Sequence, residues 1–309
     1  MNIISLPALG GETPLGILAA MGTMRLLNCF TDRPTSLSWD PENMTARLHT
    51  SHGSLDAVIA DLNSIAEGVQ PRGCLPGIEE SFPPAGETTD GLRLPPADLR
   101  RLVETSGLND QDEMHRWLCT LVTDLAFDDK GRSAISQLTA PAGRQTMATM
   151  LTKPLELVRS TPEYLAQALT GWRRVPGVTG ENLDSRAIWN ATDDGRGRGG
   201  SMRGVPGATW LALMSFPLFL TTATAKGRPS SSGWHTVRSA RRSYQEFRLP
   251  VWTQPIGPAA VTALVEHPAL SDLSPAGLRD LARLGVVHVC RSRRYQLPGS
   301  QSAGILQVV

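Results

Sequence analysis

The sequence has few lysines, few cysteines and no long apolar run. Only three of its 30 basic residues are lysines, so nearly all of its positive charge is arginine. The four cysteines lie far apart without a CxxC spacing, which argues against both a zinc ribbon and a disulfide framework. No stretch approaches the roughly 18–20 uninterrupted apolar residues that a membrane-spanning helix needs. Residues 1–14 lack the basic-then-apolar pattern of a signal peptide, so we expect a cytoplasmic protein without membrane contact.

Motifs of known catalytic chemistry are also missing. There is no Walker A, GxSxG, HExxH or SxxK pattern in the 309 residues. His49 and His52 form the only close histidine pair, which we do not interpret as a metal site. The paired acids at 128–129 and 193–194 are typical of turns. We therefore expect a protein without an active site, a metal ion or a cofactor.

Hydrophobic residues make up 40% of the chain and charged residues 19%, which excludes global disorder. Apolar spacing of three and four residues predicts helices, with Thr13 and Pro14 as the start signal of the first. Gly16 and Gly22 within it would permit a neighbouring element to approach closely. The expected helices cover 14–30, 54–66, 110–127, a segment from 141 that breaks or kinks at Pro154, 162–172, 208–220 with an interruption at Pro217, 259–266 and 275–284.

Alternating polar and apolar residues predict the strands. The expected strands are 36–39 with 45–49 as a hairpin, 134–139, 244–249, and 285–290 with 295–297 as a final hairpin. Residues 70–96, 175–203 and 226–233 read as loops, the second with short extended pieces. The predicted fold class is α+β, with mixed helices, short antiparallel hairpins and long basic loops.

The formal net charge of +1 hides a division along the chain. Residues 1–130 have a net charge of −10 and residues 131–309 one of +11. We interpret them as an acidic N-terminal and a basic C-terminal α+β region, which could form one continuous domain. Within 195–248, nine basic residues face the single acid Glu246. Such asymmetry indicates a polyanion-binding side.

Three basic clusters are candidates for nucleic-acid contact. Glycines in the run 195–204 would let the backbone approach phosphate, and arginine side chains can bind phosphate in a bidentate manner. In the second cluster, positive charge alternates with Trp234 and Tyr244, a pattern that can hold a backbone and stack bases. The third is expected in the turn of the final hairpin. The clusters comprise Arg196, Arg198 and Arg203; then Lys226, Arg228, Ser230, Arg238, Arg241 and Arg242; and finally Arg291, Arg293 and Arg294.

Each basic cluster also has an interpretation without nucleic-acid binding. The glycine–arginine run could be a solvated surface loop, and the third cluster could be solvated as well. Trp234 is somewhat more typical of core packing than of a base-stacking platform. If 238–242 is helical, Arg238 and Arg242 share one face.

Three segments, in chain order, carry a resemblance to a known family. They are 9–27 (LGGETPLGILAAMGTMRLL), followed by a hairpin with Trp39; 199–219 (GGSMRGVPGATWLALMSFPLF); and 285–294 (GVVHVCRSRR). Together they resemble the large-subunit family of type I CRISPR effector complexes (Cascade), most closely the I-G variants, formerly I-U. At 309 residues the chain is short for such a subunit.

The resemblance implies a non-catalytic antiviral-defence subunit in a crRNA-guided ribonucleoprotein complex. Such subunits help recognise the protospacer-adjacent motif, stabilise unwound target DNA and recruit a helicase–nuclease. The implied partners are the crRNA, target double-stranded DNA, the backbone and crRNA-end-binding subunits, and the helicase–nuclease. Guide pairing would supply most of the sequence specificity. By side-chain chemistry, Asn190, Arg228 and Ser230 are candidates for reading a base edge.

Two other functions remain open. One is an enzyme that cleaves RNA or DNA, with His235 as general acid or base beside Arg241. The other is a protein-interaction scaffold in which the basic half binds an acidic protein.

Overall fold

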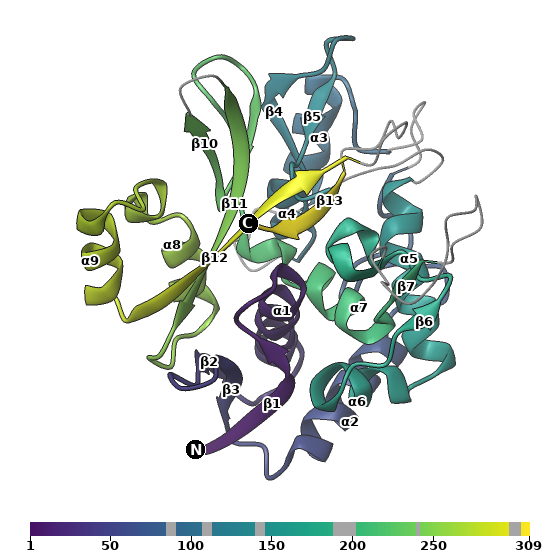
Figure 1. The fold of residues 1–309 in the computed structure, drawn as a ribbon. Coiled ribbons are helices and arrows are strands. Elements are labelled where there is room, and N and C mark those ends of the chain that lie inside the picture. The colour runs from purple at the N-terminus through teal and green to yellow at the C-terminus, as the bar shows by residue number, and fades with distance from the viewer. Residues whose placement is uncertain (85–90, 107–112, 140–145, 188–201, 239–241, 297–303) are drawn as a thin grey trace.

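A computed structural model describes residues 1–84, 91–106, 113–139, 146–187, 202–238, 242–296 and 304–309. The predicted α+β class is confirmed: helices are combined with small antiparallel sheets (Figure 1). The α-helices are α1 (Pro14–Phe30), α2 (Leu55–Glu67), α3 (Pro96–Thr105), α4 (Glu113–Leu121), α5 (Met147–Ser160), α6 (Glu163–Thr170), α7 (Pro206–Met214), α8 (Pro258–Val265) and α9 (Pro275–Arg283). Short 3-10 helices are η1 (Gly180–Asn182), η2 (Ser185–Ala187), η3 (Phe216–Leu218) and η4 (Pro268–Ser271).

The strands form small separate sheets. A three-stranded sheet has the order β1-β3-β2, and a four-stranded sheet has the order β10-β11-β12-β13. The hairpins β4–β5, β6–β7 and β8–β9 are two-stranded. The bounds are β1 (Asn2–Gly10), β2 (Ser36–Trp39), β3 (Thr45–Thr50), β4 (Val122–Phe127), β5 (Ser133–Ile135), β6 (Val175–Pro176), β7 (Arg203–Gly204), β8 (Thr221–Ala223), β9 (Pro229–Ser231), β10 (Trp234–Arg238), β11 (Ser243–Trp252), β12 (Val286–Tyr295) and β13 (Ile305–Val308).

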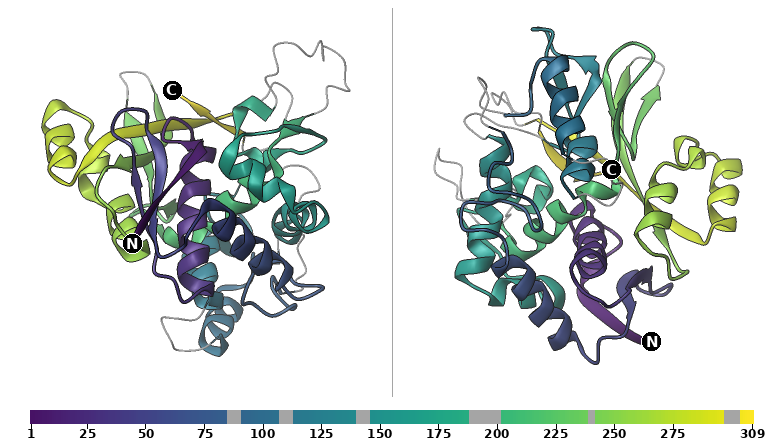
Figure 2. Two further views of the ribbon diagram at one scale, coloured as in Figure 1. Left: turned by 90° about the horizontal axis from the view of Figure 1, so that it is seen from below. Right: turned by 180° about the vertical axis from the view of Figure 1, so that it is seen from behind.

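Helix α1 lies in the middle of the molecule (Figures 1 and 2). The Thr13 side chain accepts a hydrogen bond from the Gly16 amide at 3.2 Å, and Pro14 opens the first turn, as predicted. The helix is buried all round from Pro14 to Leu27, which suits a sequence that is apolar on every face. A Cβ on Gly22 would lie 1.8 Å from the carbonyl oxygen of Leu211 in α7, so the predicted close approach is confirmed.

One buried cluster joins the two compositional regions. It runs from Ile4 to Leu306 and includes apolar residues of both 1–130 and 131–309. The Trp39 and Trp252 rings pack edge to face with their centres 6.2 Å apart. The Trp252 indole donates a hydrogen bond to the Leu37 carbonyl at 2.8 Å. The charge division is therefore not accompanied by two separate hydrophobic cores among the described residues.

Two predicted elements in the middle of the chain are wrong in extent. The helix expected over 110–127 ends at Leu121, and β4 follows directly because Val122–Phe127 pairs with β5. The Asp128–Gly131 turn closes this hairpin, with the Asp128 amide donating to the Arg132 carbonyl at 2.8 Å. The strand expected over 134–139 is β5, which ends at Ile135. Pairing across the turn outweighs the helical spacing of the apolar residues.

The predicted final hairpin is also wrong. Strand β12 continues unbroken from Val286 to Tyr295 and pairs with β13, a strand that the sequence analysis did not predict. Arg291, Arg293 and Arg294 therefore lie within a strand rather than in a turn. Likewise, β10 ends at Arg238 and β11 begins at Ser243, so Arg238 and Arg242 do not share a helix face.

Part of the loop expected over 226–233 is strand. Pro229–Ser231 forms β9, which pairs with β8 across a turn that includes Gly227 at φ +67°. Strand β1 was not predicted either, although it pairs with β3 at the edge of its sheet. In the described part of the chain, no helix is both long enough and apolar enough to cross a membrane.

Candidate nucleic-acid interface

The four-stranded sheet opens at one end between β11 and β12. The β11–β12 ladder ends at the pair Phe247–Ser292. Beyond it, β11 continues beside β10 as far as Ser243, whereas β12 continues beside β13 as far as Tyr295. Figure 1 shows the two pairs of strands diverging from this point. The divergence removes the ladder partners that would otherwise close this end of the sheet.

A pocket of about 320 Å³ lies at this opening. We call it the splayed-strand pocket. Among the described residues, its lining contains two arginines, two aromatic residues, two glutamines and a threonine, but no acidic side chain. The lining residues are Gln137, Thr139, Trp234, Tyr244, Gln245, Arg293 and Arg294.

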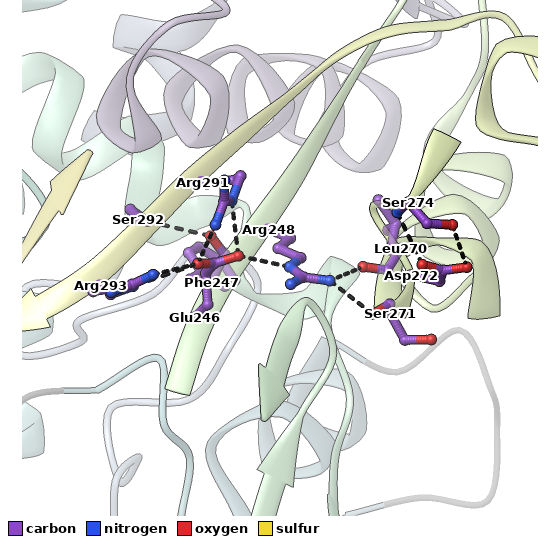
Figure 3. Close-up of polar contacts among 10 residues, drawn as sticks. All are labelled: Glu246, Phe247, Arg248, Leu270, Ser271, Asp272, Ser274, Arg291, Ser292 and Arg293. Carbon is purple, nitrogen blue, oxygen red and sulfur yellow. Dashed lines mark hydrogen bonds and ion pairs between the residues drawn. The ribbon is translucent and has the colours of Figure 1, made fainter. Parts of the chain in front are cut away.

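Arg293 of the pocket lining belongs to a cluster in which three arginines share one buried carboxylate (Figure 3). Glu246 Oε1 accepts from Arg248 Nε at 2.8 Å and from Arg291 Nε at 2.9 Å. Its Oε2 accepts from Arg291 at 2.9 Å and from Arg293 at 3.2 Å. Arg248 also donates to the Leu270 and Ser271 carbonyls at 2.6 and 2.9 Å. The local charge stays positive because three guanidinium groups share a single carboxylate.

The arrangement follows from strand alternation and register. Side chains two residues apart lie on one face of a strand, so Glu246 and Arg248 share a face of β11. Arg248 is paired with Arg291 across the ladder, which brings Arg291 and Arg293 of β12 to that same face. Burial opposes ionisation of Glu246, but hydrogen bonds from Arg291, Arg248 and Arg293 outweigh it and lower the pKa to about 2. The carboxylate is therefore ionised at neutral pH.

The Arg293 side chain is held in place from two sides. Its guanidinium carbon lies 3.6 Å from the centre of the Tyr244 ring, and its Nε and terminal nitrogen donate to Glu246. Stacking on an aromatic ring and a hydrogen-bonded carboxylate restrict its rotamers. Arg293 is nevertheless half-buried rather than enclosed, so its outer side borders the pocket.

Arg294 is held by carbonyl groups instead of a carboxylate. It donates to the Gly304 carbonyl at 2.9 Å and to the Gln137 and Leu138 carbonyls at 3.0 Å each. Its guanidinium carbon lies 5.5 Å from the Trp234 ring centre. Burial lowers the pKa of Arg294 to about 10, which leaves the group protonated at neutral pH. No carboxylate of the described residues neutralises it.

Each glutamine of the pocket lining uses one end of its side-chain amide in a hydrogen bond. Gln137 Oε1 accepts from the Ser231 amide at 3.3 Å, which leaves the NH₂ group of that side chain as a donor. Gln245 donates its NH₂ group to Thr236 Oγ1 at 2.8 Å, which leaves its Oε1 as an acceptor. The pocket rim thus offers one amide donor and one amide acceptor besides the two cations.

The structure distributes the predicted site residues over three places. Arg238, Arg242, Arg291, Arg293 and Arg294 lie on or beside the four-stranded sheet. Lys226, Arg228 and Ser230 lie in the β8–β9 hairpin, where the first two are exposed and Ser230 pairs with Thr222. The neighbouring Ser231 bonds Gln137, so this hairpin adjoins the segment that lines the pocket.

Arg203 lies elsewhere. It belongs to β7, which pairs with β6, and its carbonyl accepts from Arg174 at 2.9 Å. The views in Figures 1 and 2 agree that β7 and the β10–β11 hairpin lie on opposite sides of the molecule. Asn190, Arg196, Arg198 and Arg241 lie outside the described residues.

Trp234 and His235 are neighbours in β10 with different surroundings. Trp234 is 8% exposed and stacks on Phe247 with ring centres 5.0 Å apart, which confirms its interpretation as a packing residue. Burial, and then the charge of Arg248, lower the pKa of His235 to about 4. General acid–base catalysis works best when the pKa is near the working pH, so a pKa near 4 is poorly matched to neutral conditions.

The histidine pair at 49 and 52 is used in structural contacts. His49 Nε2 lies 2.8 Å from Ser38 Oγ. His52 is fully buried and bonds Asp61 at 2.8 Å and Thr50 at 2.7 Å. Among the described residues, no group of three or more His, Cys, Asp or Glu side chains could hold a metal ion.

Four residues of the site were not predicted from the sequence: Gln137, Thr139, Gln245 and Arg248. A signal for Arg248 was present, because Tyr244, Glu246 and Arg248 occupy every second position of a predicted strand. Arg291 and Arg293 repeat the same two-residue spacing. Gln137 and Gln245 carry no such signal, since only the fold brings them to the same pocket.

Comparison of the chain with protein-family models finds no match, and a search of curated proteins finds none either.

Proposed function

We propose that this protein is a non-catalytic nucleic-acid-binding subunit, with the open end of the four-stranded sheet as its contact surface. The observation that carries the proposal is the splayed-strand pocket, in which Arg293 and Arg294 line the wall beside aromatic and amide side chains and no described lining residue is acidic. Guanidinium groups bind phosphate oxygens, and aromatic rings contact bases. This combination suits a polyanion that also carries flat rings.

The exposed cations of the neighbouring hairpins would extend the contact. Lys226, Arg228 and Arg238 are exposed, and their side chains have no hydrogen-bond or ion-pair partner in the described part of the chain. They are therefore available to phosphate without breaking a contact of the fold. This distinguishes them from Arg248, which is 5% exposed and bonded to Glu246 and to carbonyls.

The proposed biological setting is a crRNA-guided type I CRISPR surveillance complex. Its support is the resemblance of segments 9–27, 199–219 and 285–294 to the large-subunit family. In that setting the protein would help recognise the protospacer-adjacent motif, hold unwound target DNA and recruit the helicase–nuclease. Its partners would be the crRNA, the target DNA, and the backbone and crRNA-end-binding subunits.

Salt-dependent binding tests the nucleic-acid contact. The purified protein is titrated against a fluorescent DNA at several salt concentrations. Neutralising about five to nine phosphates gives a log–log slope of roughly −4 to −8. The triple variant Lys226→Ala, Arg228→Ala, Arg238→Ala should bind more weakly, with a slope shallower by up to about 3.

The matched control removes three exposed arginines from helices instead of from the β-hairpins of the proposed surface. Arg101→Ala, Arg279→Ala and Arg283→Ala change the net charge equally on α3 and α9. The control should keep most of the affinity and most of the slope. Equal losses in both triple variants would show that only net charge matters, and unchanged binding in the first would contradict the proposed surface.

Two further measurements separate the proposal from its alternatives. Incubation with labelled RNA or DNA and a divalent metal should leave the nucleic acid intact. Cleavage that is lost in His235→Ala would instead establish a nuclease. Co-expression with the proposed subunits and crRNA should yield a complex with a high ratio of absorbance at 260 to 280 nm. Association that persists unchanged after nuclease treatment would favour a protein scaffold.

A further inference from the structure

The volume of the splayed-strand pocket limits what could fit inside it. At about 320 Å³ it is near the lower end of the range for small-molecule sites, which is roughly 300–1,000 Å³. A single nucleotide is of that scale, whereas a base pair within a double helix is not. A base can enter such a pocket only after it has left the stack, which costs least in a strand that is already single.

The lining matches the parts of one nucleotide. Arg293 is oriented by Glu246 and Tyr244 before any ligand arrives, so a phosphate at its outer side requires little ordering of the side chain. The Tyr244–Arg293 stack is a flat surface that a base can extend, because bases stack on both aromatic rings and guanidinium planes. The Gln137 amide donor and the Gln245 amide acceptor flank the pocket, where they can meet a base edge.

We propose that the splayed-strand pocket binds one unpaired nucleotide of a single strand, with its phosphate at Arg293 and its base against the Tyr244–Arg293 stack. This inference rests on the proposed nucleic-acid-binding function, which already includes unwound DNA, and assigns the contact with one unpaired nucleotide to a defined pocket and its residues. Every nucleobase offers both a donor and an acceptor on its pairing edge, except where a partner base already occupies them. The pocket therefore distinguishes unpaired from paired bases rather than one base from another.

The experiment compares a labelled 12-nucleotide DNA strand with its own duplex, at one salt concentration, for four proteins. The wild type should bind the single strand at least about tenfold more tightly. Tyr244→Ala should lose about tenfold in affinity for the single strand, in line with the loss of one stacked base, and change duplex affinity less than about twofold. Tyr244→Phe retains the ring and should behave like the wild type. Arg283→Ala, on the distant α9, should match it too.

A thermal melt of each protein shows that any loss is not due to unfolding. Tyr244 is only half-buried, so Tyr244→Ala is expected to fold. If the folded Tyr244→Ala protein keeps full single-strand affinity, or if wild type binds duplex as tightly as the single strand, the inference fails while the proposed function stands. If the wild type binds neither DNA, both fail together.

Discussion

Glu246 is the single acidic residue among residues 195–248, and the fold surrounds it with Arg248, Arg291 and Arg293. Breaking a buried ion pair by removing one partner is costly because the remaining charges are left without compensation. Here the removal of one carboxylate would leave three guanidinium groups facing each other. The cluster that borders the pocket is therefore also a stability element.

Substitution of Glu246 tests that role. We expect Glu246→Gln to lose about 3–5 kcal/mol of unfolding free energy at pH 7, measured by urea denaturation. The pKa is lowered from 4.5 to about 2 by folding, so the stabilisation is fully present above pH 4.5 and is lost as the pH falls towards 2. The difference in unfolding free energy between wild type and Glu246→Gln should therefore become smaller as the pH falls from 4.5 towards 2.

Glu42→Gln is the matched control, because Glu42 is exposed in the β2–β3 turn. Its unfolding free energy should stay within about 0.5 kcal/mol of wild type at pH 7. A Glu246→Gln protein that is as stable as this control would contradict the stabilising role of the buried Glu246 carboxylate.

At the scale of elements, helices with local start signals were predictable. The first helix was predicted over 14–30, and α1 occupies Pro14–Phe30, because Thr13 and Pro14 act within one turn. The hairpin over 36–39 and 45–49 was confirmed as β2 and β3 for the same reason: a short turn joins two alternating segments. Strand β1 was not predicted because its partner, β3, lies far along the chain. Strand β13 was not predicted because a long connection separates it from its partner, β12.

The α1–α7 contact gives a prediction at this scale. Alanine is a better helix former than glycine by about 1 kcal/mol, so propensity alone predicts that Gly22→Ala stabilises the protein. The Leu211 carbonyl at 1.8 Å from the new Cβ predicts the opposite sign, with a loss of at least about 2 kcal/mol. Thermal or urea unfolding of the variant decides between them.

Gly171→Ala serves as the control for this substitution. Gly171 has extended backbone angles, and a Cβ added to it would have no neighbouring atom within 4 Å. Its variant should be as stable as the wild type or slightly more so. A stabilised Gly22→Ala protein would mean that α1 and α7 pack less closely than the structure describes.

At the scale of the whole molecule, the acidic and basic regions share one interior. Buried Arg25 of α1 pairs with Glu113 of α4 and donates to the Met214 carbonyl of α7 at 3.2 Å. The Leu37 amide donates to the Ile256 carbonyl at 2.9 Å, which joins β2 to the C-terminal half. The charge division along the sequence therefore does not coincide with two separate hydrophobic cores among the described residues.

Fragments 1–130 and 131–309 test this integration. Each should fail to unfold cooperatively when produced alone, since α1 would lose its packing against α7 and Trp39 its contact with Trp252. Co-expression should restore a folded complex, detected by circular dichroism and a single melting transition. A fragment 1–130 with a cooperative transition of its own would contradict the shared core.

The sequence by itself determined the α+β class, the start of locally capped helices such as α1 and the excess of arginine in the second half, because these depend on composition and on neighbours within one or two turns. Tertiary structure decided which arginines are neutralised. Arg291 and Arg293 reach Glu246 from 45 and 47 residues away, through a register that no local pattern specifies. It also decided where β11 and β12 part, and so created the pocket from residues that are distant in the chain.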